Sequence, residues 1–173
     1  MKLEFGCGTK LTPGFIGVDI RPLPTVTYVS NAWELHEQVE QESVEVIKSR
    51  HFLEHLTFFD VNRTLQSWYG ILKRDGLLMI EVPNMTFHAE QWLSENRKTR
   101  IRTEIGQHKW TDEEWAIAGF WGAQRETEQG EIWDIHKSGY DFKLLEEYLH
   151  KYNFRNVVDK STMPQNLYVE CIK

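Results

Sequence analysis

The sequence predicts a single α/β domain, residues 1–173, with a mostly parallel seven-stranded sheet and helices on both faces. Three observations support this prediction. Short apolar segments alternate with amphipathic ones through the first half of the chain, as in repeated strand–helix units. The first apolar segment runs into a glycine pair. The last two apolar segments follow each other without an intervening helix, which predicts an antiparallel hairpin at the sheet edge.

Composition narrows the class of protein. Hydrophobic residues make up 40% of the 173 residues and aromatic residues 13%, so the chain can bury a substantial core. The net charge of −6 argues against nucleic acid as a partner, because that binding needs a basic surface. With only Cys7 and Cys171, neither a disulfide framework nor a multi-cysteine zinc site is expected.

The start of the chain indicates its location. Residues 1–4 lead directly into the first strand, and they do not resemble a signal peptide. No apolar run approaches the roughly 18 residues that a membrane span needs. A soluble cytoplasmic protein without a membrane partner is therefore expected.

The first two strands carry the strongest motif. An apolar strand beginning at Leu3 leads into Gly6-Cys7-Gly8, where the backbone can turn tightly and approach a ligand closely. A second strand, residues 15–20, places Asp19 near its end, where an acid can accept hydrogen bonds from ribose hydroxyls. Leu11 occupies the position of the third glycine in a dinucleotide fingerprint, which disfavours a nicotinamide-dependent dehydrogenase.

These residues resemble a known family. Residues 4–8, Glu-Phe-Gly-Cys-Gly, look like the first motif of class I, Rossmann-like, S-adenosylmethionine-dependent methyltransferases, and residues 17–20, Gly-Val-Asp-Ile, look like the second. The linking residues 9–15 are too short for the usual first inter-strand helix, as in a subgroup of small predicted methyltransferases. The resemblance implies S-adenosylmethionine as cofactor and S-adenosylhomocysteine as product. In that subgroup the frequent association is with sugar and polysaccharide pathways.

A third strand, residues 26–29, precedes Asn31-Ala32-Trp33. In the family this position often meets the adenine, so Asn31 is a candidate partner of the adenine amine and Trp33 a stacking surface. The alternative is that Asn31 caps a helix beginning near Trp33. Both interpretations remain open from the sequence.

The fourth strand, residues 44–48, ends beside Ser49, Arg50 and His51. Ligands of open parallel sheets bind beyond the carboxyl ends of the strands, near the point where the strand order reverses. The resemblance places this reversal between the first and fourth strands. We therefore expect Ser49, Arg50 and His51 to lie nearest the transferable methyl group.

The following elements complete the predicted sheet. Apolar residues from Phe58 to Leu72 recur at three- and four-residue spacing and predict a helix that ends over residues 73–76. Residues 77–82 predict the fifth strand. A helix over residues 142–152 and strands over 155–159 and 167–172 follow.

Residues 84–140 interrupt the strand–helix pattern and predict a helical insertion over the cleft. Arg97, Lys98, Arg100 and Arg102 indicate either a solvated helix face or a site for an anionic group of the substrate. The tryptophan-rich part that follows, which includes Trp133, indicates the core of the insertion or a homodimer contact. The alternative is that some of its aromatic residues line a carbohydrate or ring-bearing substrate. Residues 118–124 and 136–140 resemble two further motifs of the subgroup, the second more closely.

Residues 51–55, His-Phe-Leu-Glu-His, match the H-x-x-E-H motif of some zinc proteases. That motif needs a long helix, a third ligand and a cleft. In the family the same position often reads Leu-Glu-His at the mouth of the fourth strand. No metal site is therefore predicted, and Glu54 and His55 are expected to orient the loop.

The predicted function is methyl transfer to an oxygen or nitrogen atom of a small acceptor, with sugar-like or anionic molecules as candidate classes. His51 is the first candidate base and His136 the second, against the alternative that either is a core or capping residue. The predicted cofactor-binding residues are Glu4, Gly6, Cys7, Gly8, Asp19, Ile20, Asn31, Ala32, Trp33 and Ser49. The alternative function is a binding or assembly domain that keeps the fold without catalysis.

Overall fold

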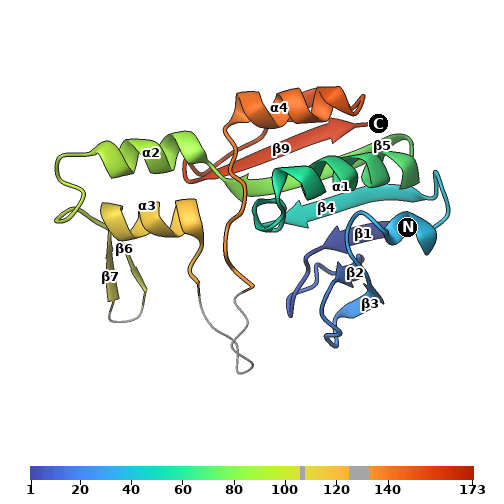
Figure 1. The fold of residues 1–173 in the computed structure, drawn as a ribbon, viewed down its shortest axis with the longest axis horizontal. Helices are drawn as coiled ribbons and strands as arrows, with labels where there is room; N and C mark the ends of the chain where they lie inside the picture. The colour runs from blue at the N-terminus through green and yellow to red at the C-terminus, as the bar shows by residue number, and fades with distance from the viewer. Residues whose placement is uncertain (106–107, 125–132) are drawn as a thin grey trace.

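The computed structural model describes residues 1–105, 108–124 and 133–173, and its centre is a seven-stranded sheet with the order β3-β2-β1-β4-β5-β9-β8 (Figure 1). The strands are β1 (Lys2–Phe5), β2 (Ile16–Asp19), β3 (Val26–Val29), β4 (Val44–Arg50), β5 (Leu72–Pro83), β8 (Arg155–Asp159) and β9 (Asn166–Ile172). The first five pair in parallel, whereas β9 runs antiparallel to both β5 and β8. The predicted α/β class with a mostly parallel seven-stranded sheet and the predicted terminal hairpin are thereby confirmed.

The helices that cover the sheet are α1 (Phe58–Ile71), α4 (Phe142–Lys151) and two short 3-10 turns, η1 (Leu35–Glu37) and η2 (Leu53–His55). The buried face of α1 packs on the middle of the sheet, where Trp68 lies 4.9 Å from Phe5 between ring centroids. Helices α1 and α4 lie side by side, and the Tyr152 hydroxyl donates to Asn62 Oδ1 at 2.8 Å.

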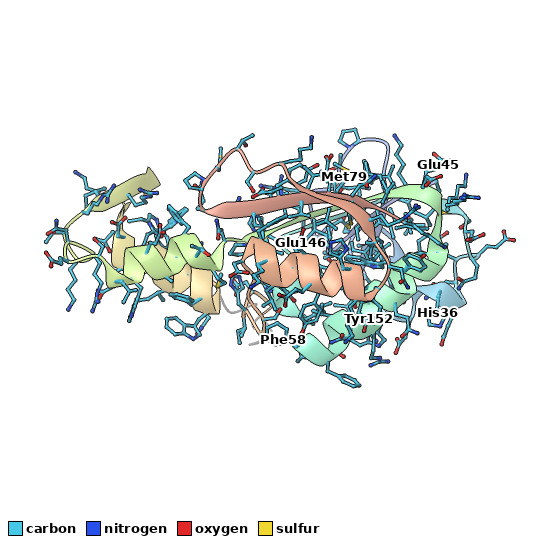
Figure 2. The ribbon with its side chains drawn as sticks, turned by 90° about the horizontal axis from the view of Figure 1, so that it is seen from above. His36, Glu45, Phe58, Met79, Glu146 and Tyr152 are labelled. Carbon is cyan, nitrogen blue, oxygen red and sulfur yellow. The ribbon has the colours of Figure 1, made fainter. Side chains whose placement is uncertain are left out.

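Among the described residues, helices cover one face of the sheet only, unlike the arrangement on both faces that the sequence predicted. Figure 2 shows Phe58 and Tyr152 on the side of the helices and Met79 on the opposite side of the sheet. The reason is connectivity, because the links β1–β2 and β2–β3 contain no helix and right-handed crossovers place the remaining helices together.

Two local expectations also differ. Near Trp33 the chain forms only the 3-10 turn η1, not a longer helix. Helix α1 ends at Ile71, and residues 73–76 belong to an irregular start of β5, where Asp75 has a φ of 59°. The side chain of Arg155 donates to Asp75 at 3.2 Å, so a contact with β8 supports this bend.

The insertion between β5 and α4 combines helices with a hairpin. It contains α2 (Met85–Leu93), β6 (Ile101–Ile105), β7 (His108–Thr111) and α3 (Asp112–Trp121), and it extends beyond the edge of the sheet (Figure 1). Among the described residues, no helix combines the length and the apolar character required to cross a membrane.

Candidate functional site

The glycine pair after β1 forms a tight turn at the carboxyl end of the sheet. Gly6 and Gly8 have φ angles of 64° and 52°, a region that side chains disfavour. The Gly6 N–H donates to the Val18 carbonyl at 2.8 Å, which ties the turn to β2. A Cβ atom on Gly6 would lie 2.4 Å from Cδ2 of Phe52. Only glycine therefore fits between the turn and the loop after β4.

Asp19 lies at the end of β2 with 6% of its surface exposed. Its carboxylate accepts hydrogen bonds from the Gly8 N–H at 3.0 Å and from the Arg21 N–H at 3.0 Å. The Arg21 guanidinium donates to both carboxylate oxygens at 3.0 and 3.2 Å. Burial opposes ionisation, but the hydrogen bonds from Arg21 and Gly8 outweigh it and lower the pKa of Asp19.

A cavity of about 410 Å³ opens beside this turn, a size typical of small-molecule sites. It lies where the carboxyl ends of β1, β2 and β4 meet the loop after β3. Of the residues predicted to bind the cofactor or act in catalysis, it brings together Gly6, Asp19, Ile20, Asn31, Ala32, Trp33 and His51.

Asn31 and Trp33 share one partner on the cavity wall. The Asn31 amide donates to Glu34 Oε2 at 2.7 Å, and the Trp33 indole N–H donates to Glu34 Oε1 at 3.1 Å. The N-cap of η1 is Glu34, so Asn31 does not cap this turn. The Arg63 guanidinium carbon lies 4.7 Å from the centre of the Trp33 ring.

Other predicted residues lie outside the cavity lining: Glu4, Cys7, Gly8, Ser49 and His136. Glu4 accepts a hydrogen bond from the Thr12 N–H at 2.7 Å and forms an ion pair with Lys48 at 3.6 Å. It thereby holds the loop that replaces the first inter-strand helix. Cys7 and Ser49 are buried, and burial raises the pKa of the Cys7 thiol.

Three of the four residues in the basic cluster, Arg97, Arg100 and Arg102, contact groups of the insertion itself. Arg97 forms an ion pair with Glu113 at 3.0 Å, and Arg100 forms one with Asp112 at 3.6 Å. The guanidinium of Arg102 lies over the Phe87 ring at 4.6 Å. These contacts lie outside the cavity lining, so they contribute to the structure of the insertion.

His51 sits at the exit of β4 in a left-handed conformation with a φ of 47°, which is uncommon for a residue with a side chain. Its Nδ1 faces Glu54 Oε1 at 3.3 Å, and its Nε2 lies 3.7 Å from Glu81 Oε1. The hydrogen bond to Glu54 raises the pKa of His51 despite the opposing effect of burial. With Nδ1–H donated to Glu54, Nε2 is the atom that can accept a proton.

Sequence reasoning missed several residues that line the cavity, notably Phe52, Asp134 and Ile135. Phe52 lies within the H-x-x-E-H stretch, but its contact with Gly6 depends on how β4 lies beside β1. Residues 133–137 return from the insertion and run along the cavity. The signals for this segment were the second resemblance, at residues 136–140, and the alternative that aromatic residues of the insertion such as Trp133 line the substrate.

Comparisons with known proteins agree with this geometry. A family model described as "Methyltransferase domain" matches residues 2–158. A SAM-dependent methyltransferase from Archaeoglobus fulgidus is 17% identical, with a TM-score of 0.61 over 99% of this chain and 85% of that one. A Thermotoga maritima methyltransferase, described as a possible histamine N-methyltransferase, is 15% identical, with a TM-score of 0.62 over 99% and 81% of the chains.

The CurJ carbon methyltransferase is 16% identical, with a TM-score of 0.60 over 99% of this chain and 47% of that one. At sequence identities of 15–17%, these similarities show the fold alone. The search of curated proteins found no match.

Proposed function

The chain belongs to the methyltransferase-domain family and uses S-adenosylmethionine, and on this premise we propose that it methylates an oxygen or nitrogen atom of a small acceptor. The observation that carries the proposal is the single cavity wall shared by Gly6, Asp19, Trp33 and His51. It combines a backbone turn, a ribose-binding acid, an aromatic face and a base in one place.

The residues fit the cofactor. Gly6 lines the cavity and has no side chain, so its backbone can lie directly against a nucleoside or its methionine group. The Asp19 carboxylate suits the two ribose hydroxyls, and Trp33 suits the adenine ring. When bound, the cofactor supplies the electrophilic methyl group. The protein orients the acceptor against it and excludes water.

His51 is the proposed base. Glu54 accepts the hydrogen of Nδ1 and holds the imidazole in the tautomer whose Nε2 can take a proton from an acceptor hydroxyl or ammonium. The two partners lie on one short loop, between the end of β4 and η2. Acceptors with a sugar-like or anionic group would meet Arg21 and Lys137 on the cavity wall.

The role of His51 is tested with His51→Asn, because asparagine tolerates the left-handed backbone of this position. We expect methyl transfer from labelled cofactor to fall by about 100-fold or more while the cofactor Kd changes little. His150→Asn on the exposed side of α4 is the matched control. Unchanged transfer in His51→Asn would remove His51 from the mechanism.

A domain that keeps the fold without transfer is the second candidate function. The Arg21–Asp19 ion pair favours it, because the guanidinium takes the hydrogen-bonding positions that ribose would use. Calorimetry separates the two candidates. Micromolar binding of S-adenosylmethionine supports the enzyme, and the lack of binding at millimolar concentration supports the second candidate.

A cytoplasmic location and a homodimer complete the proposal. Cys7 and Cys171 are free thiols, as expected in a reducing compartment. Leu93 and Trp121 on the insertion are 77% and 48% exposed, which supports self-association through this part of the chain. Sedimentation of wild type and Leu93→Glu tests the dimer, and an unchanged molar mass in the variant would exclude this contact.

A further inference from the structure

Three side chains of a metal-ligating type gather beside the cavity, at the junction between η2 and the segment that returns from the insertion. Glu54, His55 and His136 each offer a ligand atom, and these atoms all lie within 4.8 Å of one another. His55 itself lines the cavity, as do Ile135 and Lys137 on either side of His136. Of the three ligand residues only His55 lines the cavity, so the cluster lies next to the cavity.

Glu54 carries the first sign of a missing ligand. Its side chain is 1% exposed, and Oε1 faces His51 Nδ1 at 3.3 Å. The other oxygen, Oε2, is buried without a hydrogen-bond partner among the described residues. A buried carboxylate oxygen without a partner is costly, and a cation at this position would satisfy it.

The two imidazoles are held in the orientation that metal-binding histidines adopt. His55 Nδ1 lies 3.0 Å from the Ile135 carbonyl oxygen, and His136 Nδ1 lies 2.8 Å from the Gly119 carbonyl oxygen. A carbonyl can only accept, so each Nδ1 carries the hydrogen and leaves the Nε2 lone pair available. Second-shell carbonyls commonly fix metal-binding histidines in this way.

The backbone holds the cluster together. The N–H groups of Lys137 and Ser138 both donate to the Glu54 carbonyl oxygen, at 2.7 and 3.1 Å. The Ser138 hydroxyl also donates to the Leu53 carbonyl oxygen at 3.2 Å. His136 is thus fixed beside Glu54 although the two are distant in sequence. A site whose supporting contacts are already formed binds a ligand with less loss of entropy.

We propose that Glu54, His55 and His136 bind a divalent transition-metal cation, with Zn²⁺ as the ion of choice. Two imidazoles and one carboxylate are a ligand set that catalytic zinc sites use, with further positions open to water or substrate. Ligands about 2.1 Å from one ion lie about 3–4 Å apart, so shifts of about 1 Å in these side chains complete the geometry. The His51 imidazole orients the ligating carboxylate through its contact with Glu54 Oε1.

Positions of the ion that the three side chains leave open would lie next to the cavity, because His55 lines it. An oxygen-bearing group of the methyl acceptor is the expected occupant, and this part of the inference rests on the proposed function. Metal binding itself does not rest on it. This ligand set differs from that of the H-x-x-E-H motif, because Glu54 and His55 belong to that stretch, whereas His51 is not a ligand and His136 comes from the far end of the insertion.

The test is calorimetric titration of Zn²⁺ into chelator-treated protein, without cofactor or acceptor. We expect one ion per chain, with at least about a tenfold loss of affinity in Glu54→Gln and in His136→Gln. His150→Gln, an exposed histidine on α4, is the control and should bind as wild type does. Co²⁺ should give visible absorption bands in wild type that both cluster variants lose.

Two results would overturn the proposal: no one-to-one binding by folded wild type at millimolar Zn²⁺, or equal binding by wild type and both cluster variants. Circular dichroism of each metal-free variant shows that it is folded. If one variant is unfolded, the titrations of wild type with Zn²⁺ and Co²⁺ still test the proposal. Cofactor binding by the metal-free protein is measured separately, so failure of the proposed function and failure of the metal site give different results.

Discussion

Removing the Arg21 guanidinium should tighten cofactor binding. Arg21 donates to both oxygens of Asp19 through Nε and Nη2, at 3.0 and 3.2 Å. If the ribose hydroxyls bind this carboxylate, they must first displace the guanidinium. The Arg21 side chain is 35% exposed, so this pair contributes about 1 kcal/mol, nearer the value of a surface ion pair than that of a buried one.

Arg21→Met keeps the length of the side chain and its backbone N–H, but removes the competing donors. A gain of about 1 kcal/mol corresponds to a cofactor Kd about fivefold lower, measured by calorimetry. Asp19→Asn should act in the opposite direction and raise the Kd by about tenfold or more, because a neutral amide is the weaker acceptor. Asparagine is preferred to alanine because Asp19 also accepts from the Gly8 N–H in the turn.

Lys10→Met is the control for the lost charge, since Lys10 is exposed and does not line the cavity. Weaker binding by Arg21→Met would show that Arg21 contacts the cofactor directly. If Asp19→Asn also left the Kd unchanged, the ribose would not lie at the end of β2, and the interpretation of the cavity would be wrong.

Two further predictions concern stability. Gly6→Ala should lower the free energy of unfolding in urea by about 2 kcal/mol or more, because Gly6 has a positive φ and a Cβ atom would clash with Phe52. Gly14 also has a positive φ, 84°, but open space around it, so Gly14→Ala should lower the same free energy by only about 1 kcal/mol. Burial lowers the pKa of His88 to about 4 from about 6.5, so the neutral form is favoured in the folded state. The contribution of neutral His88 to the free energy of unfolding is complete above pH 6.5. It declines as the pH falls towards 4, by about 3 kcal/mol in total. His88→Gln should flatten this part of the pH–stability curve, and an unchanged slope would contradict the assignment.

The sequence was informative wherever a local pattern dictates the structure. Strand β3 and the terminal strand β8 have the bounds that were predicted, because β-branched and apolar runs there are short and clearly delimited. Helix α1 begins at Phe58 as predicted but ends at Ile71, before the irregular start of β5. The breaker residues 73–76 fit either a helix end or a bend in a strand. Pairing with β4 and the Arg155 contact decided between them.

By itself the sequence determined the glycine turn and the acid at the end of β2, because each follows from residue types within one short stretch. The parallel sheet followed from the alternation of apolar and amphipathic segments along the first half of the chain. Only the tertiary structure decided which side chains from distant segments lie next to one another around the cavity. It placed His136 near Glu54 and paired Arg21 with Asp19, and it left one face of the sheet without helices in the described part of the chain. These arrangements depend on how strands pair and how the insertion returns, and local propensity carries no information about either.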